Sequence, residues 1–314
     1  MRVGTTSYTN TMLDEFSLLK QQQLNLQNQV ATGLRVQAPS DDPGAMETTL
    51  DDLSSQATQQ QYSSNISTVQ AQANSIYSVL QSLQTISTRA GEIATSAGSS
   101  TSSQADLNNY ASEVTSLIQE AAQVVNTQDP ATGQYLFGGT NSGQPPFTVA
   151  TDGSGNVTGV TYNGNTSVNQ TAVAPGVTVA ADVPGANTTG SGAHGLITDS
   201  RTGADLFNHL IALQNDLKSG NTSAISGADG KNLQKDQDNL TYQVAYNGNV
   251  QTRLNTASTQ ATSQSNSLTS QISNASGADL VQTMTELTKT QTAYQAALQS
   301  SASIMQLSIL NFLP

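Results

Sequence analysis

The chain has 314 residues, a formal net charge of −12 and only 10 Lys and Arg side chains. It contains no Cys or Trp, and aromatic residues make up 4% of it, so disulfide frameworks and thiolate chemistry are excluded. No Lys or Arg occurs between Arg89 and Arg201, which makes nucleic acid and anionic membrane surfaces poor partners. Because the chain has so few large apolar residues, we expect it to bury its apolar groups in narrow seams along helices and not in one large core.

The first twenty residues do not have the pattern of a cleaved signal peptide. Asp14, Glu15 and Lys20 fall where such a peptide would need its apolar region. No apolar run approaches the roughly 18 residues of a membrane-spanning helix. We therefore expect no membrane insertion, and any export must use a route that does not read a cleaved signal.

The first predicted element is a helix from about Thr9 to Thr32. Its apolar residues alternate at spacings of four and three, the pattern of a coiled-coil seam, with Gln23 in one slot. The seam residues are Met12, Phe16, Leu19, Leu26 and Val30. Gly33 is a plausible left-handed cap, and Asp42 before Pro43 is typical of the start of a second helix.

A second, long helical seam follows, and a third helix comes after a break. The second seam runs through Met46, Leu50, Leu53 and Ala57 and then from Ile66 to Ile93. The Gly98–Ser103 stretch interrupts it. The third helix places Leu107, Tyr110, Val114, Leu117, Ala121 and Val124 on one face and ends near Asn126.

The pattern changes to short β runs in the middle of the chain. Val157 to Tyr162 alternates β-branched residues and is followed by Asn163-Gly164, which indicates a hairpin. We expect a small β-rich, surface-exposed insertion at residues 140–200, dominated by loops rather than by a large core.

Helical periodicity returns after the insertion and continues to the end of the sequence. It runs from Leu206 to Leu217, continues from Leu233 to Ala261, and fades in the Ser-rich stretch from Thr259 to Ser276. The final seam contains Leu280, Met284, Leu287, Tyr294, Leu298 and Met305, with Leu310 and Leu313 at the end.

These elements predict a mainly α fold: long antiparallel helical rods, paired terminal coiled-coil helices and a small β-rich insertion. Residues 1–43 with 277–314 would form a terminal assembly domain, and residues 44–139 with 201–276 a helical rod domain. Because an isolated helix is marginal in water, we hypothesise that the two ends are loose in the monomer and order on assembly.

The sequence around the first helix resembles a known family. The stretch from Leu24 to Val36, followed by Pro39-Ser40-Asp41-Asp42-Pro43, resembles the amino-terminal pattern shared by flagellins and hook-filament junction proteins of the hook-associated protein 3 type. The carboxyl end, from Thr292 to Leu298 and from Leu307 to Leu313, is similar to the junction proteins more than to flagellins. Tyr135 to Thr140, with Pro146-Phe147 nearby, is similar to the junction proteins as well.

The resemblance implies a structural subunit of the bacterial flagellum, at the hook-filament junction and needed for filament assembly and motility. It also implies export through the flagellar channel to the extracellular flagellum. The implied partners are the first hook-associated protein, flagellin, copies of the chain itself, and an export chaperone at the carboxyl end. The chain departs from the family at Leu34, where a basic residue is common, and in having only Arg253 before the Ser-rich stretch.

The terminal seams are the predicted assembly interface. Stripes of Leu, Ile and Met at helical spacing are usually intramolecular core, and we interpret the inner seams in that way. For the terminal seams we expect burial between subunits, mostly on the strength of the resemblance. The predicted interface residues are Met12, Phe16, Leu19, Leu26, Val30, Leu280, Met284, Leu287, Tyr294, Leu298, Met305 and Leu310.

The inventory of catalytic groups predicts no enzyme, cofactor or metal site. His194 and His209 lack the His-Glu-x-x-His pairing of a zinc protease, so we interpret both as solvated or packed histidines. Asp41 and Asp42 fit a turn and a helix cap better than a catalytic pair. The glycine-rich stretches at Gly138-Gly139 and Gly153–Asn156 lack the Lys-Ser or Lys-Thr of a phosphate-binding loop, and we expect turns there.

Two other structural functions stay open from the sequence. A flagellin filament subunit would share the terminal helices, and the start Met-Arg-Val and the Leu-Asn-Phe-Leu ending favour the junction protein over it. A secreted coiled-coil adhesin would bind through the β insertion. An adhesin needs no pairing of the two chain ends, so truncation of the ends would leave its oligomer intact.

Overall fold

The computed structural model describes residues 4–99, 102–130 and 132–310, and side chains from residue 10 to residue 303. The helices are α1 (Gly4–Thr32), α2 (Pro43–Ala97), α3 (Gln104–Val125), α4 (Leu206–Ser219), α5 (Thr222–Ala224), the π-helix η1 (Ile225–Asp229), α6 (Gly230–Ser276) and α7 (Leu280–Leu310). The chain forms two compact units, a terminal unit of Met1–Gln59 with Ser263–Pro314 and a central unit of Gln60–Thr262. Helices α2 and α6 each contribute residues to both units.

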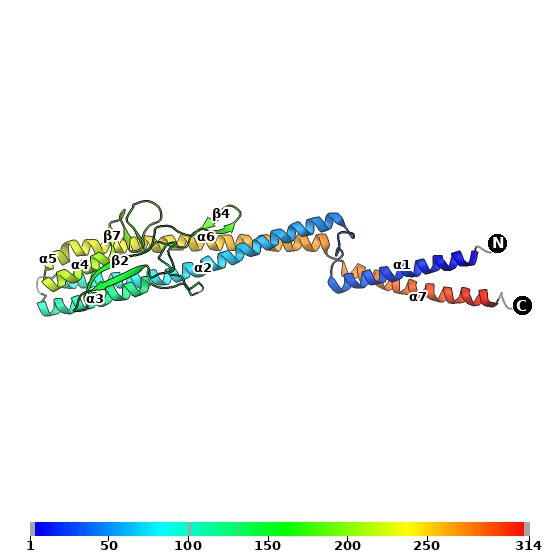
Figure 1. Ribbon diagram of the computed structural model, residues 1–314, viewed down its shortest axis with the longest axis horizontal. Helices are drawn as coiled ribbons and strands as arrows, with labels where there is room; N and C mark the ends of the chain where they lie inside the picture. The colour runs from blue at the N-terminus through cyan, green and yellow to red at the C-terminus, as the bar shows by residue number, and fades with distance from the viewer. Residues whose placement is uncertain (1–3, 100–101, 131, 311–314) are drawn as a thin grey trace. The chain divides into compact units, whose positions relative to one another are not determined.

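The fold is mainly helical with a small β region, as the sequence predicts (Figure 1). The strands are β1 (Phe147–Thr151), β2 (Val157–Tyr162), β3 (Thr171–Ala174), β4 (Val177–Val179), β5 (Ala186–Asn187), β6 (Thr198–Asp199) and β7 (Ala204–Asp205). Strands β1 and β2 form one antiparallel hairpin and β3 and β4 another. In the third sheet β6 is parallel to β5 and antiparallel to β7.

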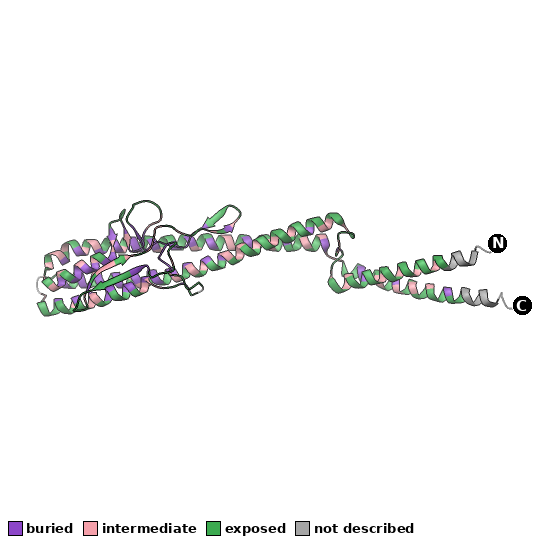
Figure 2. Cartoon of the chain, in the orientation of Figure 1, coloured by how far each residue is buried: buried purple, intermediate pink, exposed green. Residues whose placement is uncertain are grey.

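The central unit has one continuous apolar core to which helices and β segments both contribute. Phe147 of β1 lies against Phe207 of α4, with ring centroids 5.4 Å apart. Gln214 of α4 donates to the backbone carbonyl of Val157 in β2 at 3.1 Å. The β region therefore shares the core of the helices, which is why its own stretch of sequence carries so few large apolar residues. Figure 2 shows the buried positions gathered in this unit.

Helix α6 continues through the Ser-rich stretch in which the apolar periodicity fades. Leu254, Ala261 and Leu268 recur every seven residues and are all buried, so a thin heptad stripe persists among the serines. A helix exposed on most of its surface needs only such a stripe for its contacts.

The hairpin of β1 and β2 turns at residues 152–156 and not at Asn163-Gly164, which corrects the predicted position of its turn. The Asp152 carboxylate accepts hydrogen bonds from the backbone amides of Ser154 and Asn156 at 2.8 and 2.9 Å. Gly155 supplies a left-handed residue with φ of 83°. The stretch from Gly153 to Asn156 is thus a turn, as predicted.

A second difference lies between α4 and α6, where the predicted helical pattern runs on without a break. Helix α4 ends at Gly220, whose φ is 70°, and the chain returns through α5 and the π-helix η1. Asn221 caps the new turn by accepting from the backbone amide of Ala224 at 3.3 Å. A left-handed glycine followed by a capping asparagine is a stop and restart signal that the apolar periodicity alone does not show.

Candidate assembly interface

Helices α1 and α7 form an antiparallel pair in the terminal unit (Figure 1). The residues of the predicted α1 seam are among the less exposed ones of that helix: Leu26 is buried, and Met12, Phe16, Leu19 and Val30 are half-buried. Heptad spacing of these side chains turns one stripe of the helix toward α7.

The seam of α7 is built largely from small residues. Thr283, Thr290 and Ser301 are buried, and Leu287, Tyr294 and Ala297 are half-buried. The Ser301 hydroxyl donates to the Ala297 carbonyl at 2.7 Å, and its oxygen lies 3.6 Å from the Met12 sulfur. The threonines, the alanine and the serine are not among the residues predicted from the sequence, although they recur at alternating spacings of three and four around Leu287 and Tyr294, and that spacing is the signal that could have found them.

The structure divides the predicted α7 residues into two sets. Leu287 and Tyr294 are half-buried in the pair, whereas Leu280, Met284 and Leu298 are exposed, Met284 by 57% and Leu298 by 46%. The side chains of Met305 and Leu310 lie outside the described residues. Met284 and Leu298 share one heptad position, and Leu298 lies four residues after Tyr294, whereas Thr290 and Ala297, three residues after Leu287 and Tyr294, turn toward α1.

The outer faces of the pair therefore carry uncovered apolar side chains. On α1 these are Leu13, Leu18 and Leu24, of which Leu18 is 66% exposed. We call them, with Leu280, Met284 and Leu298, the apolar flank. Single exposed apolar residues scattered over a surface are ordinary, but six large ones on two adjoining helices that bury so little are not.

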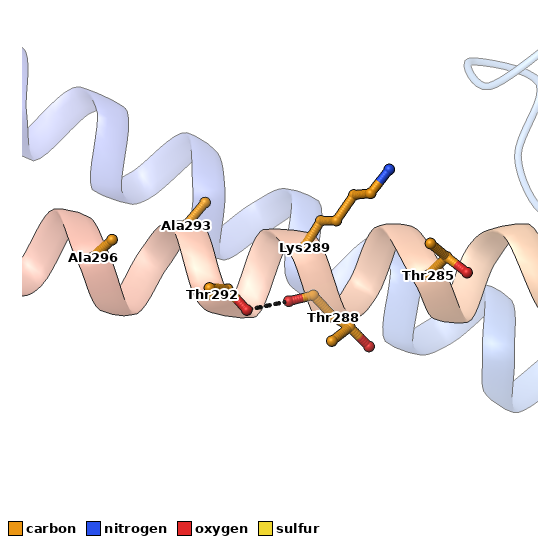
Figure 3. A pocket seen from close by; sticks show the side chains of 6 residues that line it. All are labelled: Thr285, Thr288, Lys289, Thr292, Ala293 and Ala296. Carbon is orange, nitrogen blue, oxygen red and sulfur yellow. Dashed lines mark hydrogen bonds between the residues drawn. The ribbon is translucent and has the colours of Figure 1, made fainter.

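Between the apolar residues, α7 presents a shallow hollow lined mostly by small side chains. Figure 3 shows it lined by Thr285, Thr288, Lys289, Thr292, Ala293 and Ala296, all from this one helix. The hydroxyl of Thr292 donates to the backbone carbonyl of Thr288 at 2.9 Å, so its hydrogen-bonding need is met inside the helix. Small side chains with satisfied hydroxyls leave room for another helix to approach closely.

A corner of backbone hydrogen bonds ties the two ends of the sequence together beside the pair. The Arg35 amide donates to the Ser276 carbonyl at 2.7 Å, and the Ala278 amide donates to the Gly33 carbonyl at 2.9 Å. The Arg35 guanidinium donates to the Ala275 carbonyl at 3.0 Å and pairs with the Asp42 carboxylate at 3.2 Å. Residues more than two hundred positions apart in the sequence are thereby joined.

The two aspartates of the corner have the predicted turn and cap roles. Asp42 accepts from the Ala45 amide at 3.1 Å, and α2 begins at Pro43. Asp41 accepts from the Gln37 and Ala38 amides at 3.0 and 2.9 Å. These amide hydrogen bonds lower the pKa of both carboxyls, and Arg35 lowers the pKa of Asp42 further. Gly33 closes α1 with φ of 70°, as expected of a left-handed cap.

The family follows from two matches at the two ends of the sequence. A model described as the bacterial flagellin N-terminal helical region matches residues 3–142, and one described as the C-terminal helical region matches residues 231–313. The chain belongs to the flagellin family. The unmatched middle of this flagellin-family chain contains the β strands and α4.

Solved structures of hook-associated proteins share the fold. A protein described as a flagellar hook-associated protein from Vibrio parahaemolyticus is 20% identical with a TM-score of 0.64, covering 76% of this chain and 100% of that one. Flagellar hook-associated protein 3 from Legionella pneumophila is 14% identical with a TM-score of 0.59, covering 73% and 98%. FlgL of Xanthomonas campestris is 17% identical with a TM-score of 0.56, covering 69% and 98%. A search of curated protein sequences finds no match.

The two histidines are packed in the central unit. Nδ1 of His209 lies 2.8 Å from the buried Asp236 carboxylate, and the His194 ring lies against Tyr242 with centroids 4.3 Å apart. Burial raises the pKa of Asp236, and its hydrogen bond with His209 opposes that rise. Among the residues that the structure describes, no group of three or more His, Asp or Glu side chains is arranged to hold a metal ion.

Within the same described residues, none of the helices combines the length and the apolar character needed to cross a membrane.

Proposed function

We propose that this flagellin-family chain is a hook-filament junction protein, an extracellular structural subunit of the bacterial flagellum and not an enzyme. The observation that carries the proposal is the apolar flank of α1 and α7. These helices bury little against each other and leave large side chains such as Leu18 and Met284 uncovered within the chain. Burial of one such side chain contributes about 1.5–3 kcal/mol, so a neighbour that covers several of them gains a stable contact.

In this proposal the terminal residues 1–43 and 277–314 are the assembly part, and all twelve predicted interface residues act there. Met12, Phe16, Leu19, Leu26, Val30, Leu287 and Tyr294 hold the two helices together. Leu280, Met284 and Leu298 are covered by neighbouring subunits. We expect Met305 and Leu310, nearer the carboxyl end, to take part in the same helix pairing or the same contacts with neighbouring subunits. Residues 44–139 and 201–276 are the helical rod, and residues 140–200 a surface-exposed insertion.

The partners we propose are further copies of the chain, the first hook-associated protein on one side and flagellin on the other. An export chaperone would cover the carboxyl-terminal helix before assembly. This is supported by the exposed leucines of α7, because uncovered apolar stripes favour aggregation in the free protein. The fold likeness to hook-associated protein structures favours this assignment over an adhesin.

The test is deletion of the gene with complementation by the full chain or by a version that ends before Leu280. We expect hooks without filaments, flagellin released to the medium, and rescue by the full chain alone. Normal filaments in the deletion strain would overturn the junction assignment. A filament subunit is the second candidate, since both flagellin regions match this chain. It is distinguished by immunogold labelling along the whole filament instead of at its base.

A further inference from the structure

A small cavity opens beside α6 in the central unit. Its volume is about 190 Å³, and its walls come from Asp182 and Val183, from the loop of residues 192–194 and from one face of α6. Drug-sized ligands occupy roughly 300–1,000 Å³, so this cavity has room for a small head group and not for a nucleotide or a sugar chain. All of its residues belong to the central unit, whereas the apolar flank belongs to the terminal unit.

One wall of the cavity is aromatic. Tyr242 and Tyr246 lie one turn apart on α6, and they are 44% and 37% exposed. The His194 ring, which also lines the cavity, packs against Tyr242 with centroids 4.3 Å apart. The face of a tyrosine ring carries negative charge density and attracts a cation that lies over it. Two uncovered tyrosine rings on one face of a helix therefore favour a positively charged ligand.

The cavity is also lined by a buried carboxyl group. Asp182 is 8% exposed, its Oδ1 accepts from the Gln72 side-chain amide, and its Oδ2 accepts from the Asn169 backbone amide at 3.2 Å. Burial, and less strongly the charge of Asp129, raises the pKa of Asp182, and the hydrogen bonds from Asn169 and Gln72 oppose that rise. Because both oxygens accept from amide donors, these contacts suit the ionised form of the carboxyl.

Asp182 differs from two other buried carboxylates of the central unit in lacking a cationic neighbour. Asp199 pairs with Arg201 at 2.6 Å, and Asp236 lies 2.8 Å from His209. Within the part of the chain that the structure describes, no Lys or Arg side chain pairs with Asp182. A buried carboxylate costs free energy unless a counter-charge compensates it. A cation in the cavity would supply that counter-charge.

Buried amides hold the loop of the cavity in place. Gln243 is almost fully buried, and its side chain donates to the carbonyls of His194 and Gly195 at 3.3 and 3.1 Å. Asn187, which is fully buried, donates to the Ala193 carbonyl at 2.6 Å. The cavity is therefore formed before a ligand arrives, and binding costs little ordering of the loop.

The surrounding groups argue against an anion or a metal ion as the ligand. The Arg201 guanidinium lies beside the loop, but it is bound to Asp199 and to the Gly192 carbonyl. The described residues contain no cluster of three or more His, Asp or Glu side chains that could hold a metal ion. An organic cation needs no such cluster, because aromatic faces and a carboxylate can hold it.

We propose that this cavity binds an alkylammonium cation, whose head group lies against the rings of Tyr242 and Tyr246 and pairs with the Asp182 carboxylate. The ligand is a free quaternary ammonium solute or the lysine side chain of a neighbouring protein, since both present this chemistry. The net charge of −12 raises the local concentration of either one. The site does not rest on the junction assignment, and its test leaves that assignment untouched.

The first test is an NMR titration of the unaltered full chain with choline and with its neutral isostere, in which carbon replaces the ammonium nitrogen. We expect choline to shift the amide signals of residues 182–183, 192–194 and 242–246 in a saturable way. The neutral isostere has the same shape but no charge, so it should bind roughly tenfold more weakly. Equal binding of the two compounds, or no saturable shift at these amides, would overturn the proposal.

The second test removes the two features that attract the cation. Tyr246→Leu keeps an apolar side chain but loses the aromatic face, and Asp182→Asn keeps the shape but loses the charge. Each should weaken choline binding by roughly tenfold. Tyr77→Leu is the matched control, because Tyr77 is a tyrosine of α2 that is 39% exposed and does not line the cavity. Unchanged choline binding in both cavity variants, or an equal loss in the control, contradicts the proposed site.

A third titration distinguishes the two sources of the cation. It compares choline with Nα-acetyl-lysine amide, which presents the lysine side chain alone, and with the uncharged Nα-acetyl-glutamine amide. Tighter binding of choline assigns the site to a free quaternary ammonium solute, and tighter binding of the lysine compound assigns it to the side chain of a neighbouring protein. If neither cation binds more tightly than the glutamine compound, the proposal fails.

Discussion

The ring of Phe16 in α1 meets the ring of Tyr294 in α7 edge to face, with centroids 5.9 Å apart and planes at 77°. It is the one aromatic contact between the two ends of the sequence among the described side chains. Both side chains are half-buried, in a seam whose α7 half is otherwise mostly small residues. This contact therefore fixes the register of the pair.

From that contact we predict a measurable coupling between the two rings. Phe16→Ala and Tyr294→Ala should each speed amide exchange in both α1 and α7. The double variant should lower the free energy of opening of the pair by less than the sum of the two single effects. The coupling expected of an edge-to-face pair is about 0.5–1.5 kcal/mol. Leu18→Ala, which removes an exposed leucine of the same helix, is the control and should leave exchange unchanged. Strict additivity would mean that the rings do not stabilise the pairing.

We predict that the terminal pair is the least protected helical part of the free monomer. Large buried apolar residues are scarce in it: Leu26, 7% exposed, is the single buried one in the described part of α1. Amides of α1 and α7 should exchange much faster than those of α3 and of the central parts of α2 and α6, and should become protected on assembly. Protection of the dilute monomer's ends equal to that of α3 would contradict both this prediction and the hypothesis of folding on assembly.

The sequence was a good guide to the helices because each depends on local spacing and on its caps. The first helix ends at Thr32 as predicted, and Gly33 and Asp42 act as the expected stop and start signals. Gly220 was overlooked because the apolar residues on both sides of it continue at helical spacing. Asp229 of η1 is only 3% exposed, and this could not have been found from the pattern, since aspartate is normally an exposed residue.

The register of α7 shows why the candidate interface was harder to predict. Met284 and Leu298 are the larger apolar residues and were therefore assigned to the seam. The smaller Thr283, Thr290 and Ala297 lie in the seam instead. Which of two neighbouring heptad positions faces inward depends on the facing helix, and that information is not in the α7 sequence by itself.

In the central unit we predict that Arg201 is required for stability, because it pairs with the buried Asp199 carboxylate. The Asp199 side chain is fully buried, and the Arg201 guanidinium donates to both of its oxygens at 2.9 and 2.6 Å. Burial alone would raise the pKa of Asp199, but the hydrogen bonds from Arg201 and from the Gly195 amide outweigh it and lower that pKa.

Arg201→Gln should therefore destabilise the central unit by about 3–5 kcal/mol in urea unfolding, because it leaves a buried carboxylate without its partner. Since the pKa of Asp199 is lowered in the folded chain, the stability from this pair is present above the ordinary pKa of 3.8 and is lost as pH falls below it. Arg253→Gln is the control: Arg253 is exposed and donates to the Thr178 carbonyl at 3.2 Å. Equal effects of the two substitutions would refute the argument.

The apolar flank gives a prediction that separates assembly from folding. Met284 and Leu298 lie 14 positions apart on one stripe of α7, about 21 Å along the helix, and both are exposed. Replacing both with Gln removes apolar surface that the monomer does not bury. The stability of the monomer should therefore change by no more than about 0.5 kcal/mol.

Filament formation should nevertheless fail in cells that carry Met284→Gln with Leu298→Gln, because a neighbouring subunit would have to bury two amides in place of two apolar side chains. The control is Glu286→Gln with Gln299→Ala, which alters exposed polar residues of the same helix. Export of each variant is checked in the medium, so that a block in secretion is not mistaken for a block in assembly. If the exported double variant restores normal filaments, the flank is not buried between subunits, and the contacts that build the junction must be sought on the outer face of α1 or on the central unit.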